Sequence, residues 1–232
     1  MESEIKVMLK EKVLVLAVHP DDETLGCGGT LLKHKSDGDS IHWLIATKIS
    51  QEKGFSNSEV ESRAKEIEMV KNKYQFDSVH FLDLDTMYCE QYPLSEIIKK
   101  CSHVINEVKP SVIYVPFRGD VHSDHRVCFD AIYACTKSFR YPFIKKVLMM
   151  ETLSETEFSI TTADNMFIPN VFININEHIH KKCEIMEIYK SECGDHPFPR
   201  STESIQSLAK FRGGTAGVNF AESFMLLKEI RK

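Results

Sequence analysis

The sequence predicts an α/β fold in which a mostly parallel β-sheet lies between two layers of helices, with a C-terminal elaboration. Between residues 12 and 152, short apolar runs alternate with helix-length amphipathic segments, which is the pattern of βαβ units. The 232 residues are 42% apolar, enough for one globular unit with a sizeable core. We therefore expect a single domain over residues 1–232, with a core at about 10–152 and the elaboration at about 153–232.

The expected core consists of apolar runs of strand length separated by helical segments. Strands bury short runs rich in Val, Ile and Leu, of which "KVLVLAV" is the first. Ser56 or Ser58 is a suitable N-cap for the longest helix, and the next helix ends before Pro110. The predicted strands are 12–18, 40–47, 78–84, 111–117 and 145–152, and the predicted helices are 30–38, 56–75, 93–110 and 125–138.

After Glu151 the regular alternation loosens. A loop rich in proline and charge, "GDHPFPRS", interrupts this part of the chain. The segment 222–230 suits either a strand or a helix. The other predicted elements here are an outlying strand at 169–175 and helices at 176–192 and 204–212.

Composition and charge exclude several classes of protein. The net charge is −5 with acids and bases mixed along the chain, which gives no support for a nucleic-acid partner. The apolar runs are too short for an integral membrane segment, and the first residues are polar without a signal-peptide core, so we expect a cytoplasmic location. The seven scattered cysteines form no Cys-x-x-Cys pair, and we expect most of them to be buried apolar residues. The sequence does not indicate an oligomeric state.

The first chemically distinctive stretch is "AVHPDDETLGCGGT", which places His19, Asp21, Asp22 and Glu23 directly after the first strand. Ligands of parallel sheets bind at the carboxyl ends of the strands. A His and an Asp three residues apart in such a turn can face one zinc ion, and Asp21 could then take a proton from the metal-bound water. The alternative is an acidic helix N-terminus without a metal.

The glycine-rich stretch that follows could instead indicate a phosphate-binding loop. "GCGG" fits neither G-x-G-x-x-G nor the lysine-bearing phosphate loop. We expect Gly26, Gly28 and Gly29 to permit a close approach of this turn to the sheet.

The second distinctive stretch is "PFRGDVHSDHRV", with Asp120, His122, Asp124 and His125 after the strand at 111–117. Both stretches fall on the same edge of the predicted sheet, so this one can supply the third metal ligand. His122 and Asp124 are suited to pair, the carboxylate orienting the imidazole. The alternative is a solvated surface loop, which two His and two Asp within six residues disfavour.

Basic residues near these stretches are candidates for substrate binding. Arg118 lies beside the second stretch, and His196 and Arg200 lie in the loop at 194–201. Each could contact a phosphate or carboxylate of a substrate, although a plain surface loop is an equally simple explanation for 194–201.

The two stretches together resemble the LmbE-like family, also called the PIG-L de-N-acetylase family. "ESRAKE", "VINEVKPSVIYVPF" and "PRSTESIQSLAKFRGGTAGVNFAESF" are similar to its bacterial branch, so the resemblance covers nearly the whole chain. It implies a Rossmann-like fold, one catalytic zinc, and removal of an N-acetyl group from a GlcNAc-type amino sugar or sugar conjugate. One departure is Ser123, where the family usually has proline.

The resemblance also implies roles for individual residues. The zinc ligands would be His19, Asp22 and His125. Asp21 would be the general base, and His122, oriented by Asp124, would stabilise charge or act as the acid. Arg63, in "ESRAKE", would lie near the substrate.

Three alternatives stay open at this point. The same site could hydrolyse a non-sugar amide. The chain could be a Rossmann-like binding module without catalysis, although the glycine fingerprint is missing. Iron(II) or another divalent ion could replace zinc, because a His₂Asp site is not selective.

Overall fold

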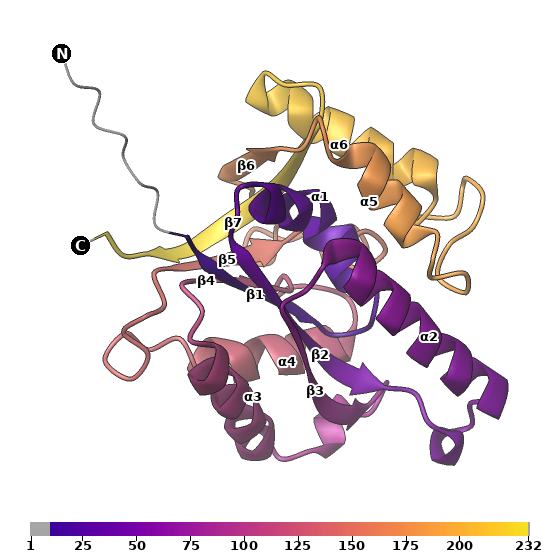
Figure 1. The fold of residues 1–232 in the computed structure, drawn as a ribbon, viewed down its shortest axis with the longest axis vertical. Helices are drawn as coiled ribbons and strands as arrows, with labels where there is room; N and C mark the ends of the chain where they lie inside the picture. Colours follow the sequence, from indigo (N-terminus) through magenta and orange to yellow (C-terminus); the bar gives the residue numbers. More distant parts are fainter. Residues whose placement is uncertain (1–9, 232) are drawn as a thin grey trace.

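The computed structural model describes residues 10–231 and shows a three-layer α/β fold (Figure 1). The predicted fold class is confirmed. Within these residues one seven-stranded sheet runs in the order β3-β2-β1-β4-β5-β7-β6. Strands β1 to β5 are parallel, and β7 is antiparallel to both of its neighbours. The strands are β1 (Lys12–Ala17), β2 (Ser40–Lys48), β3 (Ser78–Asp85), β4 (Val112–Val115), β5 (Lys146–Met150), β6 (Val171–Asn174) and β7 (Ala221–Glu229).

Helices cover both faces of the sheet (Figure 1). Alternate side chains of a strand point to opposite faces, and β1 divides accordingly. Its Val13 and Val15 pack in the cluster with α1, α2, α5 and α6, whereas Leu14 and Leu16 pack with α3 and α4. The helices are α1 (Asp22–Ser36), α2 (Asn57–Tyr74), α3 (Leu94–Val108), α4 (Ser123–Ala134), α5 (Ile179–Met186) and α6 (Thr202–Ala216).

The strand order places a crevice beside β1. From β1 the chain proceeds outward through β2 to β3, whereas from β4 it proceeds in the other direction to β5. Such a reversal separates the loops at the carboxyl ends of two adjacent strands, and ligands of α/β sheets bind there. The two distinctive stretches follow β1 and β4, so both lie at this reversal.

Helix α1 begins at Asp22, earlier than the helix predicted at 30–38, and includes the glycine-rich stretch. The glycines do permit close packing, but Gly28 lies against Tyr74 on α2 and not against the sheet. A Cβ on Gly26 would lie 2.9 Å from Met150 Cβ, and one on Gly29 would lie 2.8 Å from Ile175 Cγ2. Only glycine lets the helix pack this closely against β5 and the segment after β6.

The C-terminal elaboration holds α1 together at a break in its backbone. Cys27 has non-helical φ and ψ of −150° and 23°. Beyond the break, the amides of Gly29 and Thr30 donate to the two oxygens of Glu222 on β7, at 2.9 and 2.7 Å. The buried ammonium of Lys182 on α5 donates to the same carboxylate at 2.7 Å. Glu222, to which no role could be assigned from the sequence, therefore caps the second half of α1.

Several expectations for the C-terminal part are now resolved. The undecided segment 222–230 forms most of strand β7, which joins the same sheet as the core strands. The predicted strand and helices here shift by a few residues, and the helix at 176–192 shortens to α5.

Two inferences from composition have structural counterparts. Six of the seven cysteines are buried and all seven are free thiols, with Cys193 half-buried. Among residues 10–231, no helix has both the length and the apolar character that crossing a bilayer requires.

Candidate active site

The first stretch turns sharply between β1 and α1. The His19 amide donates to Asp22 Oδ2 at 2.8 Å, which ties the start of the turn to the start of the helix. Asp21 has a φ of 148°, a region that side-chain-bearing residues rarely occupy. Such backbone strain, at about 1–3 kcal/mol, is most often found at functional sites. The turn thus presents an imidazole and two carboxylates at the crevice.

His19, Asp22 and His125 form a candidate metal site. Their ligand atoms all lie within 4.8 Å of one another. His125 Nε2 is 3.3 Å from Asp22 Oδ2, yet it is buried and makes no hydrogen bond with any residue from 10 to 231. A buried nitrogen without a partner is costly unless something else binds it. Two imidazoles and a carboxylate are the donor set of a divalent metal site with room for water.

The imidazole ring of His125 is held in a fixed orientation by contacts on its Nδ1 side. Its Nδ1 lies 2.8 Å from Asp120 Oδ2, and the Thr156 hydroxyl donates to Asp120 Oδ1 at 2.7 Å. Although burial favours the neutral ring, the carboxylates of Asp22 and Asp120 raise the pKa of His125. The same negative field favours a bound cation. Asp120 therefore has the position of a residue that orients a metal ligand.

Asp124 contacts His19 more closely than His122, unlike the pairing expected from the sequence. Its carboxylate lies 3.2 Å from His19 Nε2 and 3.9 Å from His122 Nδ1. The backbone amides of Met87 and Cys89 donate to its two oxygens at 2.7 and 3.1 Å. His122 is oriented instead as the N-cap of α4, where its Nδ1 accepts from the Asp124 amide at 3.1 Å.

His19, His122 and Asp124 form a second group whose ligand atoms are close enough for a metal. In this group each oxygen of the carboxylate already accepts a hydrogen bond from a backbone amide. The group that contains the unpartnered Nε2 of His125 therefore suits a metal better.

Asp21 lies beside this group and is buried. Burial, and then the neighbouring Asp22 carboxylate, raise the pKa of Asp21, while the Arg200 guanidinium opposes them. Arg200 Nη1 is 3.5 Å from Asp21 Oδ2. A buried carboxylate with a raised pKa has the proton affinity that a general base needs.

A profile of the PIG-L family, described as GlcNAc-PI de-N-acetylase, matches residues 14–136, just over half of the chain. This range contains both distinctive stretches. The chain belongs to the PIG-L family.

Two proteins are similar to this PIG-L chain over nearly its whole length. Diacetylchitobiose deacetylase of Thermococcus kodakarensis is 24% identical over 240 aligned positions, which span 95% of this chain and 84% of the relative. The conserved protein TT1542 of Thermus thermophilus superimposes with a TM-score of 0.75 at 23% identity, covering 96% of this chain and 97% of that one.

The same fold also occurs in a protein named for a different reaction. The 4-carboxy-2-hydroxymuconate hydratase of Pseudomonas putida superimposes with a TM-score of 0.70 at 16% identity, over 96% of this chain and 98% of that one. The fold alone therefore does not fix the chemistry. The reaction has to be inferred from the family membership and from the side chains at the site.

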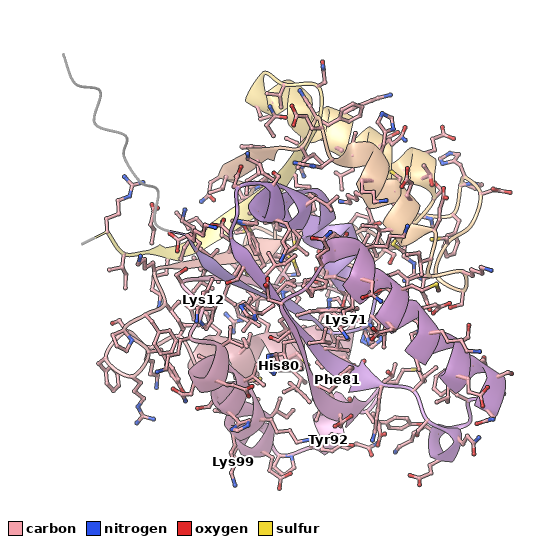
Figure 2. The ribbon with its side chains drawn as sticks, viewed as in Figure 1. Lys12, Lys71, His80, Phe81, Tyr92 and Lys99 are labelled. Carbon is pink, nitrogen blue, oxygen red and sulfur yellow. The ribbon has the colours of Figure 1, made fainter. Side chains whose placement is uncertain are left out.

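A cavity of about 730 Å³ opens beside His19, Asp21 and Asp22. This volume lies within the usual range for sites of small molecules, about 300–1,000 Å³. Its apolar wall includes Phe55 from the loop after β2, and Phe81 from the edge strand β3 (Figure 2). The cavity can therefore accommodate a small molecule that has both polar and apolar surfaces.

Arg63 lies in the wall of this cavity, as the family resemblance implies. Its Nη1 donates to the Pro20 carbonyl at 2.7 Å, and its Nη2 binds the Glu192 carboxylate. Arg200 Nη2 lies 3.1 Å from the other oxygen of Glu192. These three side chains form an ion-pair chain, Arg63–Glu192–Arg200, along one side of the cavity.

Arg118 is not brought to the cavity. Its side chain is 73% exposed and its Nε lies 3.8 Å from Asp130 on α4. The chain turns after β4 so that Arg118 points outward, and the structure gives no support to its predicted role in substrate binding.

Among the residues of the cavity wall that were not singled out from the sequence are Glu155 and Glu192. Each occurs in an irregular segment without a motif. Their only sequence signal is a carboxylate in a loop, which is common on protein surfaces.

Proposed function

We propose that this protein is a zinc-dependent hydrolase that removes the N-acetyl group from a GlcNAc-type amino sugar or sugar conjugate. The observation that carries the proposal is the buried, unpartnered Nε2 of His125, which faces Asp22 and His19 at the edge of the cavity. Membership of the PIG-L family and the deacetylase named among the relatives support the reaction.

His19, Asp22 and His125 would hold the metal. A zinc ion there would polarise the acetyl carbonyl and lower the pKa of a bound water to about 7. Iron(II) also suits two imidazoles and one carboxylate, so metal identity has to be measured.

Asp21 would accept the proton of the attacking water. It lies next to the metal ligand Asp22 and faces the cavity, and its ion pair with Arg200 fixes the carboxylate and favours the ionised form. Removal of a well-placed general base typically lowers turnover about 10²- to 10⁴-fold.

His122 would donate a hydrogen bond to the developing oxyanion. Burial and the neighbouring His19 ring lower the pKa of His122 to about 4, so the ring is neutral near pH 7. Since Nδ1 accepts from the Asp124 amide, the single proton resides on Nε2. A fixed N–H of this kind stabilises negative charge in acyl transfer. Asp21, which has taken the proton of the water, would then pass it to the departing amine, because the neutral His122 ring has no acidic proton to give.

The experiment that tests the proposal measures acetate release by the zinc-reconstituted protein. The substrates are free N-acetylglucosamine, UDP-linked and glycoside-linked N-acetylglucosamine, and simple non-sugar amides. We expect release from at least one sugar, and a decrease of about 100-fold or more in Asp21→Asn with its metal retained.

Each alternative function has its own result in this assay. Release from the non-sugar amides alone would replace the sugar by another amide. Bound metal with no release from any amide would favour a binding module without catalysis.

A further inference from the structure

The loop after β5 carries one carboxyl group into the cavity wall, that of Glu155. Two backbone hydrogen bonds fix its position. The Glu155 amide donates to the Thr152 carbonyl at 3.2 Å, and the Val121 amide donates to the Glu155 carbonyl at 3.2 Å. Val121 lies between Asp120 and His122, so the loop is anchored directly to the second distinctive stretch.

The carboxyl group of Glu155 lacks a partner. Its Oε2 atom is buried, yet makes no hydrogen bond with any residue between 10 and 231. The nearby cation Arg200 is committed elsewhere, since it binds Glu192 and Asp21. Leaving a buried oxygen unpaired costs free energy that a packed loop does not recover by itself. A partner supplied from the cavity would remove this cost.

The chemistry of that partner is restricted. Glu155 belongs to neither group of side chains close enough to share a metal ion. A carboxyl oxygen needs a hydrogen-bond donor, and the hydroxyl groups of a sugar are the donors that a GlcNAc-type substrate brings into the cavity. Burial raises the pKa of Glu155 to about 7, so its ionised form is destabilised, and a hydrogen bond from a hydroxyl group would stabilise that form.

We propose that Glu155 is a specificity-determining residue that forms a hydrogen bond with a hydroxyl group of the amino sugar. The inference rests on the proposed function and adds a residue that selects the sugar. It predicts that replacing the substrate's hydroxyl or the enzyme's carboxyl removes the same interaction.

The test compares Glu155→Ala and Glu155→Gln with wild type on the best GlcNAc substrate and on its 3-, 4- and 6-deoxy derivatives. A hydrogen bond to a charged group corresponds to roughly 10- to 100-fold in kcat/KM. We expect Glu155→Ala to lose this factor on the parent sugar and to lose little on one deoxy derivative. Metal content should be unchanged. Glu157→Gln, an exposed residue on the same loop, is the matched control.

Additive losses on all three deoxy derivatives, or activity equal to wild type in both Glu155 variants, would overturn the inference while the deacetylase stands. Loss of metal in these variants would also overturn it, because the residue would then be structural.

Calorimetric binding of the deacetylated amino sugars separates this inference from the proposed function. If wild type releases no acetate, the proposed function fails. Binding that weakens only in the Glu155 variants would still support the carboxyl as a sugar ligand. Equal binding by wild type and variants, or no binding by wild type, would overturn it.

Discussion

The candidate metal site and the ion-pair chain Arg63–Glu192–Arg200 beside it are built in different ways. In the candidate metal site, Asp22, Asp124 and His125 are buried and are fixed by backbone amides or by other buried groups. The ion-pair chain consists of long side chains that keep 14%, 23% and 21% of their surface exposed.

This difference indicates which part of the site is preorganised. Buried groups held by several short hydrogen bonds cannot rearrange without a large cost. Partly exposed ion pairs contribute little and exchange partners readily. We therefore expect the candidate metal site to be preorganised, whereas Arg63 and Glu192 can adjust to a bound substrate.

The largest expected effect comes from removing a metal ligand. His125→Ala should abolish stoichiometric metal binding, because the variant lacks the nitrogen that has no other partner in residues 10–231. Metal content by elemental analysis checks this, with His103→Ala, an 80% exposed histidine, as the control. Full metal occupancy in His125→Ala would refute the ligand assignment.

An intermediate effect is expected from changing Asp120, which contacts Nδ1 of the proposed ligand His125. Asp120→Asn weakens the support of His125 Nδ1, and loss of such a partner typically costs about 10- to 100-fold in metal affinity. Competition with a coloured chelator measures the affinity. Asp130→Asn, on the exposed face of α4, should leave it unchanged. Equal affinities in both variants would mean that Asp120 does not support the ligand.

The smallest effect is expected in the ion-pair chain Arg63–Glu192–Arg200. Glu192→Gln removes the charge that occupies both Arg63 and Arg200. Ion pairs that solvent reaches are worth about 0–1 kcal/mol, and these side chains are partly exposed, so KM should change by less than about 5-fold. KM should fall for substrates with a phosphate or carboxylate and stay constant for neutral ones. A collapse of kcat with neutral substrates would show that the ion-pair chain is as preorganised as the candidate metal site. Glu203→Gln, on the exposed surface of α6, is the control.

The strand pattern was sufficient to predict the sheet and the meeting of the two polar stretches. The run "VLVLAV" identifies a buried strand by local composition, and a polar cluster after such a strand must lie at its carboxyl end. The two stretches could therefore be placed together from the strand pattern, whereas the choice of His19, Asp22 and His125 within them came from the family resemblance.

Contacts that depend on loop conformation could not be predicted in this way. Asp124 lies nearer to His19 than to His122 because the amides of Met87 and Cys89 fix its carboxylate, and no sequence pattern positions those amides. Glu155 enters the cavity for a similar reason. The assignment of catalytic roles, the single domain, the cytoplasmic location and the absence of a nucleic-acid partner stay predictions.

The cap that Glu222 places on α1 has a consequence for the timing of folding. The hydrogen-bond partner of the Gly29 amide is a carboxylate that lies 193 residues further along the chain. At about 5–20 residues per second, a ribosome needs on the order of 10–40 s to synthesise that interval. Throughout this time the helix that begins at Asp22 lacks the buried partner of its second half. The first motif to be translated is therefore among the last parts of the molecule to become complete.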